Sequence, residues 1–250
     1  MKVFVINLAR DVNKRLWIEK ECARQDLDFE IYSAVDGGGL SEAFLNENVF
    51  DYGKNFMTNG EIGCALSHIN LYKKIIDDDL KYALIIEDDA VLDDGLKELL
   101  LSFEKENKNE GIFLLTGGFE YIENKKIDIG SFEFFPVNTA SMTTGYIITI
   151  GAAKKMLDFL LPVRFEADMF KIFRICAGVN IYGKVPHFIS TNDKDKVSSS
   201  IEMERSLVSE KRMDYRHVLF KKEERKKRIS RFFWRVFLRK LEKVKKYEAY

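Results

Sequence analysis

Three consecutive acids, Glu87, Asp88 and Asp89, directly follow an apolar run at residues 83–86 that predicts a buried strand. Adjacent carboxylates repel one another and lose hydration near a core, so this arrangement requires a compensating partner. Mg²⁺ and Mn²⁺ prefer oxygen ligands and are often held by one or two carboxylates together with substrate phosphates. The triplet therefore indicates a divalent cation at a strand end, with a solvated turn that caps the next helix as the alternative.

Alternating strands and helices over residues 1–190 are expected to position these acids. Apolar runs predict strands, and apolar residues at helical spacing predict helices between them. The strands are expected near 2–6, 28–35, 82–86, 111–116, 144–150 and 180–190, and the helices near 11–25, 58–78, 94–108, from a turn at Gly151 onward, and from about 166. This order predicts an α/β sandwich with a mostly parallel central sheet.

Ligands of such sheets bind beyond the carboxyl ends of the strands. The acids at 87–89 follow one such end, and the glycines at 37–39 follow another. Thr58 and Glu61 fit a capping box at the start of the next helix. Gly60 and Gly63 flank this helix start, whose free N–H groups suit a phosphate or a close loop.

Charge is distributed very unevenly, although 40 basic and 40 acidic residues give a net charge of zero. Residues 221–246 contain 13 Lys or Arg and three Glu, a net charge of +10, so the rest of the chain carries −10. Apolar residues at helical spacing (Phe233, Phe237, Leu241 and Val244) predict a basic amphipathic helix over 221–250. We expect a domain over 1–190 and a polar connecting segment over 191–220.

Composition narrows the class of protein. A chain that is 46% hydrophobic and 32% charged is typical of a globular protein. Three widely separated cysteines, Cys22, Cys64 and Cys176, indicate reduced thiols and a cytosolic setting. The N-terminus does not read as a secretory signal, and no run approaches the ~18 apolar residues of a transmembrane helix.

Five segments, in order, resemble the blocks of glycosyltransferase family 25, which includes bacterial lipooligosaccharide galactosyltransferases and is related to the collagen galactosyltransferases. The segments are "FVINLARDVNKR", "YSAVDG", "GEIGCALSHINLYKKI", "ALIIEDDAVL" and "YIITIGAAKKML". The resemblance covers about residues 1–190. It implies a GT-A-like nucleotide-sugar-binding fold and inverting transfer of a hexose, commonly galactose from UDP-galactose, to a lipooligosaccharide or lipopolysaccharide core sugar.

The same resemblance implies Mn²⁺ or Mg²⁺ at the acidic motif, bridging the donor diphosphate. Asp89 would contact the metal, Asp88 the metal or the ribose, and Glu87 would support them. A late histidine serves as a further metal ligand in some GT-A enzymes, which makes His187 a candidate. A surface histidine is the alternative for that position.

Other side chains are candidates for the UDP-sugar site. Asn7, Arg10 and Arg15 follow the first strand, and a solvated helix face is the alternative for both arginines. Asp36 is positioned to bind uracil or ribose, with an ordinary turn aspartate as the alternative. The third matching block adds Gly63, Ser67 and His68 as donor-site residues. His68 shares a helix face with Cys64, but zinc would need more ligands than these two, and a buried structural histidine is the alternative.

Inverting transfer needs a general base that deprotonates the acceptor hydroxyl. The segment "PVRFEADMFKIF" contains Asp168, our candidate for the base, and Glu166, the second candidate. Favourable charge at a helix N-terminus is the alternative for both. Two rival functions remain open at this point: a nucleotidyltransferase and a nucleotide-sugar-binding protein without turnover.

A lipooligosaccharide acceptor would be embedded in a membrane. We therefore expect a cytoplasmic protein that is peripheral on the inner face of the bacterial inner membrane, bound to anionic headgroups through residues 221–246. Packing of this tail on the catalytic domain or a second subunit, and non-specific nucleic-acid binding, are the alternatives.

Overall fold

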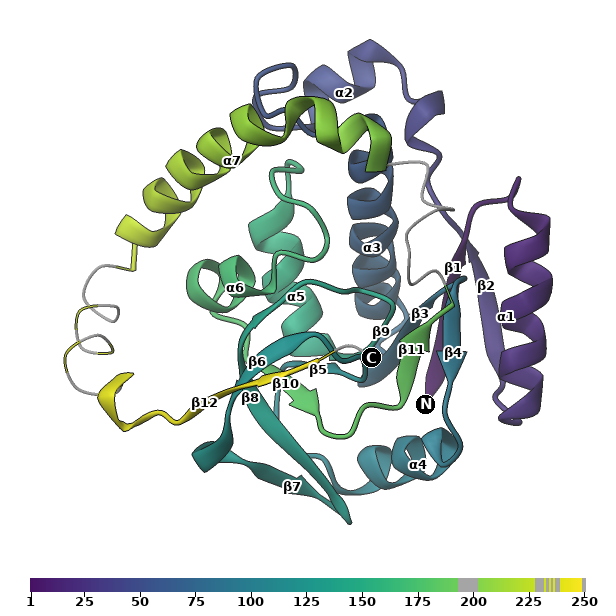
Figure 1. Ribbon diagram of the computed structural model, residues 1–250. Coiled ribbons are helices and arrows are strands. Elements are labelled where there is room, and N and C mark those ends of the chain that lie inside the picture. Colours follow the sequence, from purple (N-terminus) through teal and green to yellow (C-terminus); the bar gives the residue numbers. More distant parts are fainter. Residues whose placement is uncertain (193–201, 228–231, 233, 235, 237–238, 249–250) are drawn as a thin grey trace.

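In the computed structural model, ten strands of the described chain form one central sheet (Figure 1). The structure describes residues 1–192, 202–227, 232, 234, 236 and 239–248. The strand order is β12 (Val244–Tyr247), β6 (Phe119–Ile122), β8 (Phe132–Ala140), β10 (Ile181–Lys184), β5 (Ile112–Leu114), β9 (Gly145–Thr149), β3 (Tyr82–Glu87), β1 (Lys2–Asn7) and β2 (Phe29–Ser33), and β7 (Ile127–Ile129) pairs with β8. A separate ribbon pairs β4 (Ala90–Leu92) with β11 (Ile189–Thr191).

The α/β class is confirmed, whereas the expectation of a mostly parallel sheet is corrected. Only β1–β2, β1–β3 and β5–β10 are parallel among the strand pairs of this sheet. The reversal begins at β9, which lies between β3 and β5 and is antiparallel to both. Residues 119–140 add antiparallel strands beyond β10. The parallel part therefore consists mainly of β2, β1 and β3, whose carboxyl ends meet at one edge.

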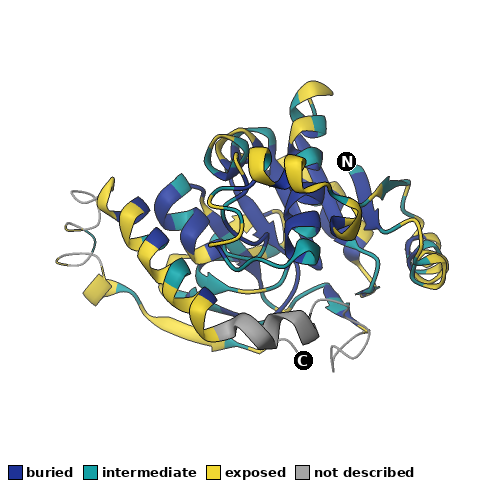
Figure 2. Cartoon of the chain, turned by 90° about the horizontal axis from the view of Figure 1, so that it is seen from above, coloured by how far each residue is buried: buried dark blue, intermediate teal, exposed yellow. Residues whose placement is uncertain are grey.

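Helices cover both faces of the sheet, and each face has its own core. One core includes side chains of α2 (Glu42–Asn48), α3 (Asn59–Asp77), α5 (Ile150–Leu160) and α6 (Phe170–Ile172), and the other includes α1 (Val12–Arg24) and α4 (Leu96–Glu106). Along β3, Ala83 and Ile85 face the first core, whereas Leu84 and Ile86 face the second. Burial on both faces explains why this strand is apolar throughout. Figure 2 shows the buried sheet between helices whose outer sides are exposed.

The start of α3 is fixed by local chemistry that the sequence predicts. The Thr58 side chain accepts a hydrogen bond from the Glu61 N–H (3.2 Å), and the Glu61 carboxylate accepts one from the Thr58 N–H (2.9 Å). This confirms the capping box. The glycine-rich turn Gly37–Gly39 packs so closely here that a Cβ on Gly37 would lie 1.7 Å from the Asn59 carbonyl oxygen. Glycine is needed at 37 because nothing larger fits between the turn and the helix.

The C-terminal region differs from the expected connecting segment and basic helix. Helix α7 (Glu202–Arg225) begins inside the segment expected to be a polar connection and crosses the N-terminal end of α3 (Figure 1). Farther on, β12 is a strand that pairs antiparallel with β6, so the expected helix does not continue through Val244. Backbone pairing with an available sheet edge is invisible to side-chain periodicity, which explains the error. Phe233 and Phe237 of the predicted stripe lie outside the described residues.

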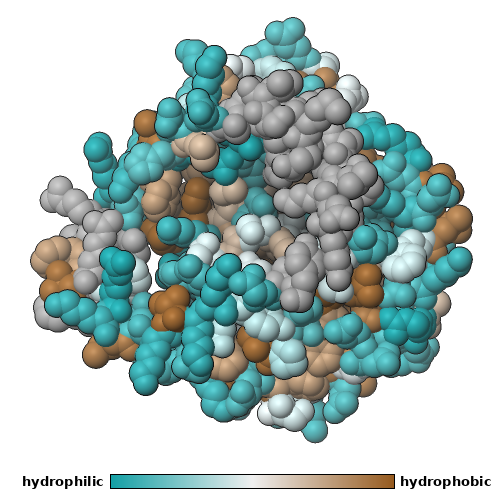
Figure 3. Space-filling view, viewed as in Figure 1, coloured by the Kyte–Doolittle hydropathy of each residue, from teal (hydrophilic) through white to brown (hydrophobic). Residues whose placement is uncertain are grey.

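Within the described chain, no helix has both the length and the apolarity needed to cross a membrane. The face shown in Figure 3 is mostly hydrophilic, with hydrophobic residues in small scattered groups.

Candidate active site

A cleft of about 700 Å³ opens where the carboxyl ends of β1, β2 and β3 meet the first turns of α3. Parallel strands bring residues that are distant in sequence to this edge, because Ile6 is in register with Tyr32 on one side and Glu87 on the other. Several predicted site residues line the cleft: Arg10, Asp36, Gly60, Ser67, His68, Glu87, Asp88 and Asp89. The structure thus brings together most of the side chains that were chosen from separate sequence blocks.

The three acids point to three different sets of partners. Glu87 accepts a hydrogen bond from the Thr143 hydroxyl (2.5 Å), and its carboxylate lies 3.4 Å from His68 Nε2. Asp88 accepts one from the Asn7 side-chain amide (2.7 Å). Asp89 accepts one from the Thr191 hydroxyl (2.7 Å). Divergence at the strand end keeps the carboxylates apart but does not remove their mutual repulsion.

Charge compensation at this turn is incomplete. Burial, and then the charges of Glu87 and Asp88, raise the pKa of Asp89 to about 6. Burial also raises the pKa of Asp88, and the ammonium group of Lys14 is 4.0 Å from its carboxylate. Asp89 Oδ1 is buried and makes no hydrogen bond within the described part of the chain. An unsatisfied carboxylate oxygen among like charges fits a hard divalent cation, so the residues present suit Mg²⁺ or Mn²⁺.

Asn7, Arg10 and Asp36 have clear positions around the cleft, and Arg15 lies apart from it. Asn7 is buried and orients Asp88 by donating a hydrogen bond to its carboxylate. Arg10 and Asp36 both line the cleft and form an ion pair with each other. Arg15 does not line the cleft and instead pairs with Glu19 (2.8 Å) on the exposed face of α1. That geometry favours the solvated-helix interpretation of Arg15.

Ser67 and Gly63 hold the cleft wall together from within α3. The Ser67 hydroxyl accepts a hydrogen bond from the Val35 N–H (2.8 Å) and donates one to the Gly63 carbonyl (2.7 Å). A Cβ on Gly63 would lie 2.6 Å from the Val35 carbonyl oxygen. Both residues therefore fix the loop after β2 against α3, and this geometry gives them a structural role in the cleft wall.

His187 lies away from the cleft. Its Nδ1 lies 2.7 Å from the hydroxyl of Tyr247 in β12, and partial burial lowers its pKa. The geometry does not bring His187 to the acidic turn formed by Glu87, Asp88 and Asp89, where the expected metal would lie.

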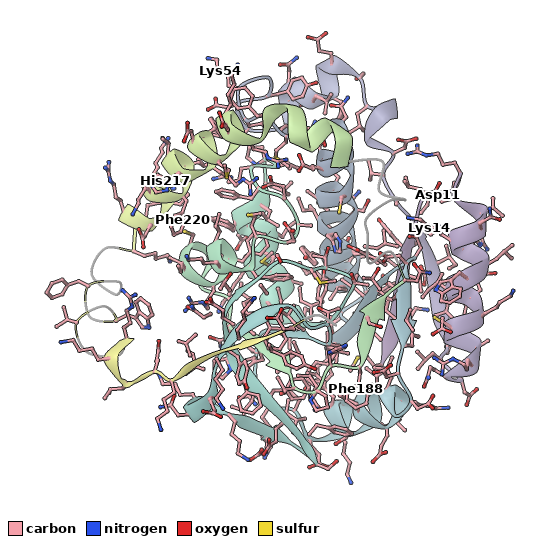
Figure 4. All side chains as sticks on the ribbon, viewed as in Figure 1. Asp11, Lys14, Lys54, Phe188, His217 and Phe220 are labelled. Atoms are coloured by element: carbon pink, nitrogen blue, oxygen red, sulfur yellow. The ribbon has the colours of Figure 1, made fainter. Side chains whose placement is uncertain are left out.

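A second cavity of about 580 Å³ lies between the loop after β8, α6 and α7. Asp168 lines it together with Lys171, Arg216 and Lys221. Glu166 does not line either cavity, since it is buried and lies 2.9 Å from the Arg216 guanidinium. Figure 4 shows the separation: Asp11 and Lys14 of the first cleft lie at the start of α1, whereas His217 and Phe220 of the second cavity lie on α7.

Comparison with known proteins bears directly on this arrangement. The family model described as glycosyltransferase family 25 (LPS biosynthesis protein) matches residues 1–171. The chain belongs to glycosyltransferase family 25. The matched region contains the cleft, the acidic turn and Asp168, but it ends before α7.

Two relatives illustrate how far this family likeness extends. The chain is 28% identical to human procollagen galactosyltransferase 2 over 192 residues, which are 66% of this chain and 30% of that protein. It is 30% identical over 180 residues to a Haemophilus influenzae protein provisionally named a glycosyltransferase, covering 68% and 63% of the two chains. The chain thus spans about a third of the human protein and less than two thirds of the bacterial one.

Likeness to solved structures is weaker. HddC from Yersinia pseudotuberculosis aligns at a TM-score of 0.41 with 12% identity, over 81% of this chain and 98% of the other. A likeness at this level supports no conclusion about the site of the family 25 chain.

Several cleft residues of this family 25 protein were missed from sequence. Lys14 lies in the first turn of α1, close in sequence to the chosen Arg10, so extending the search into the helix start would have found it. Thr143 and Thr191 reach the acids from 56 and 102 residues away, and no local pattern marks them. Cys64 lines the cleft beside His68, although its spacing alone suggested only a shared helix face.

Cys64, His68 and Glu87 also form a group whose candidate ligand atoms all lie within 4.8 Å of one another. His68 is almost fully buried, with Nδ1 2.7 Å from the Tyr146 hydroxyl, which in turn lies 2.9 Å from the Tyr72 hydroxyl. His68 thus lines the cleft and also belongs to a buried network of tyrosine hydroxyls, which agrees with the structural alternative for this residue.

Proposed function

We propose that this chain is an inverting, metal-dependent glycosyltransferase that moves a hexose from a UDP-sugar, with UDP-galactose as the leading donor. The observation that carries the proposal is Asp89: a partly buried carboxylate with a raised pKa and a buried, unsatisfied oxygen, next to Asp88 on a large cleft. Family membership supports glycosyl transfer as the reaction. UDP-glucose and N-acetylhexosamine donors are the alternatives.

In this proposal Asp88 and Asp89 would hold Mn²⁺ or Mg²⁺. Such an ion, when bound, neutralises the donor diphosphate and stabilises the charge of departing UDP. Asn7 orients Asp88 through its side-chain amide, and the paired side chains of Arg10 and Asp36, which line the cleft, would contact the nucleotide. Fixed polar groups of this kind lower the cost of organising the donor for attack.

The acceptor is proposed to bind at the second cavity and to reach the donor in the first cleft, with Asp168 as the general base for the attacking hydroxyl. Asp168 is the only acid among the described residues that line this cavity. Glu166 fits the base less well because its carboxylate lies against Arg216. Lys171, Arg216 and Lys221 make the cavity cationic, which favours an acceptor that carries phosphate or carboxylate groups. A lipooligosaccharide or lipopolysaccharide core sugar is the proposed acceptor class.

An acceptor embedded in a membrane would favour a peripheral position on the inner face of the inner membrane. Described tail residues with exposed cations include Arg239, Lys240, Lys243 and Lys246. Each cation near an anionic surface contributes about 1 kcal/mol before screening. A full-length variant with these four residues changed to Gln keeps β12. Compared with the unmodified chain, it should lose salt-sensitive binding to anionic vesicles. Equal vesicle binding by the two proteins would sink the membrane proposal.

A donor screen tests the central proposal. Purified protein is incubated with single UDP-sugars, Mn²⁺ and truncated lipooligosaccharide acceptors, and UDP release is measured. We expect release with one donor, loss with a chelator, and loss by on the order of 10³-fold in Asp89→Asn, since metal charge stabilisation amounts to several kcal/mol.

The rival functions predict different results in the same screen. A nucleotidyltransferase would release pyrophosphate from a nucleoside triphosphate and a sugar phosphate. A nucleotide-sugar-binding protein would bind a UDP-sugar and release no UDP. Normal turnover of Asp89→Asn with Mn²⁺ would remove that residue from the metal site.

A further inference from the structure

His68 has an unusual environment for a buried imidazole. Its exposed fraction is 1%, and its Nε2 atom makes no hydrogen bond among the described residues. The Glu87 Oε1 atom lies 3.4 Å from Nε2. Cys64 lies one helical turn earlier on α3, on the same face, and is partly exposed on the cleft wall. A thiol, an imidazole nitrogen and a carboxylate therefore converge beside the cleft.

We propose that Cys64, His68 and Glu87 form a second metal site, selective for a soft or borderline divalent cation such as Zn²⁺. Tetrahedral Zn²⁺ with ligand bonds of about 2.0–2.1 Å places nitrogen and oxygen ligands about 3.3 Å apart. The separation of 3.4 Å between His68 Nε2 and Glu87 Oε1 matches this requirement. The Cys64 sulfur lies within 4.8 Å of the other two ligand atoms. A tetrahedral site would need it about 3.6 Å from them, so binding requires the Cys64 side chain to move closer.

The surroundings of the three residues support a metal-binding role. The imidazole nitrogen that does not face the group, Nδ1, lies 2.7 Å from the Tyr146 hydroxyl, and Thr143 donates to Glu87 at 2.5 Å. Protein metal sites commonly hold a ligating histidine and carboxylate by such outer hydrogen bonds, which fix the orientation of both ligands. Three protein ligands leave a fourth position for water or a substrate atom.

This site is distinct from the carboxylate pair proposed for Mn²⁺ or Mg²⁺. Asp88 faces Asn7, and Asp89 faces Thr191, so neither belongs to the thiol-containing group. Ligand chemistry separates the ions as well, because thiolate and imidazole favour Zn²⁺ whereas all-oxygen ligands favour Mg²⁺ and Mn²⁺. Zn²⁺ binding would release the Cys64 proton and join α3 to β3 at the cleft wall. Binding does not depend on the proposed transfer reaction.

The test uses Co²⁺ as a spectroscopic probe on the full reduced chain. A thiolate-to-cobalt charge-transfer band should grow to one equivalent and be displaced by Zn²⁺. Cys64→Ser should abolish the band and weaken Zn²⁺ binding at least about 10-fold. Cys22→Ser and Cys176→Ser are matched controls in buried positions and should retain the band. Asp89→Asn should also retain it, which separates this site from the carboxylate pair.

A second measurement covers the case in which Cys64→Ser fails to fold. Zn²⁺ should slow alkylation of Cys64 in the unmodified chain at least about 10-fold, read by peptide mass spectrometry, whereas Mg²⁺ should not. No cobalt band in the unmodified chain, a band that survives in folded Cys64→Ser, or alkylation of Cys64 at an unchanged rate would each overturn the proposal.

Discussion

The partly buried acids of the cleft and the fully buried acids beneath α7 are compensated in opposite ways. Beneath α7, the Arg212 guanidinium contacts Glu61 at 2.5 Å, and the Arg216 guanidinium lies 2.9 Å from Glu166. In the cleft, the Lys14 ammonium is 4.0 Å from Asp88, and Asp89 accepts a hydrogen bond from the Thr191 hydroxyl. The chain therefore supplies its own cations in one region and leaves a deficit of positive charge in the other.

This difference separates two roles for a buried carboxylate. A carboxylate paired with arginine has a counter-charge within the fold and contributes to packing and orientation, as Glu61 does at the α3 capping box. A carboxylate without a matched cation destabilises the fold unless an external cation binds. We therefore interpret the region beneath α7 as structural and the acidic turn as a binding site. The following variants test this distinction.

The largest change in stability is expected from Arg212→Met. Removal of one partner leaves the Glu61 carboxylate, whose side chain is 1% exposed, without its guanidinium. Breaking a buried pair in this way typically costs about 3–5 kcal/mol of unfolding free energy, which urea denaturation measures. Lys126→Met removes an exposed partner of Glu133 and is the control, with a much smaller expected cost because water screens exposed ion pairs. Similar costs for both variants would contradict a structural role for the α7 pair.

Substitutions of the two candidate bases, Asp168 and Glu166, should have different effects. Asp168→Asn should lower kcat by on the order of 10²-fold with donor binding retained, since a general base contributes at least that much. Glu166→Gln should instead lower the unfolding free energy, because it leaves Arg216 without its carboxylate partner. Single-turnover kinetics and donor titration measure the first effect, and urea denaturation measures the second. The assignment is reversed if Glu166→Gln alone shows the kinetic loss.

A gain in stability is expected from Asp89→Asn, the variant that should lose activity. Since folding raises the pKa of Asp89 from about 4 to about 6, the folded state binds a proton more tightly than the unfolded state. The stabilisation that the protonated Asp89 gives to the folded state is present below pH 4 and is lost as pH rises through 6. At pH 7 the free energy of unfolding of the variant should therefore be about 1–3 kcal/mol higher than that of the unmodified chain. This difference should disappear by pH 4.

The matched control for that comparison is Asp77→Asn, at an exposed position on α3, which should change stability by less than about 0.5 kcal/mol. Mn²⁺ should raise the melting temperature of the unmodified chain and leave that of Asp89→Asn unchanged. A variant at position 89 that is destabilised at pH 7 would show that the carboxylate is compensated inside the fold after all.

Local patterns predicted the parts of this protein that local chemistry determines. The apolar run of β3, the acids that follow it and the capping box of α3 depend on neighbouring residues and are found where the sequence indicated. One local prediction was wrong: Gly151 lies inside α5, because the Thr149 side chain caps a helix that begins at Ile150. The parallel register of β1, β2 and β3 then brought most of the predicted site residues together.

Long-range pairing explains what could not be predicted. Strands β6, β7 and β8 were missed because their residues are only partly apolar and gain their place through pairing at a sheet edge. Arg212 reaches Glu61 across 151 residues, and no sequence spacing connects them. Long-range pairing also explains the wrong prediction for His187. This residue follows a late strand as expected, but its side chain pairs with Tyr247 of β12.

The smallest effect is expected from the arginines that the sequence could not separate. Arg15 lies on the exposed face of α1 against Glu19, so Arg15→Gln should change both stability and donor KM very little, within about 0.5 kcal/mol. Arg10 lines the cleft and pairs with Asp36, so Arg10→Gln should raise the donor KM about two- to fivefold, the scale of an exposed ion pair. Both side chains are more than half exposed and lie five residues apart, so they differ mainly in which surface they face. Steady-state kinetics with the donor varied measures the difference, and a larger KM change for Arg15→Gln would place the nucleotide on the outer face of α1.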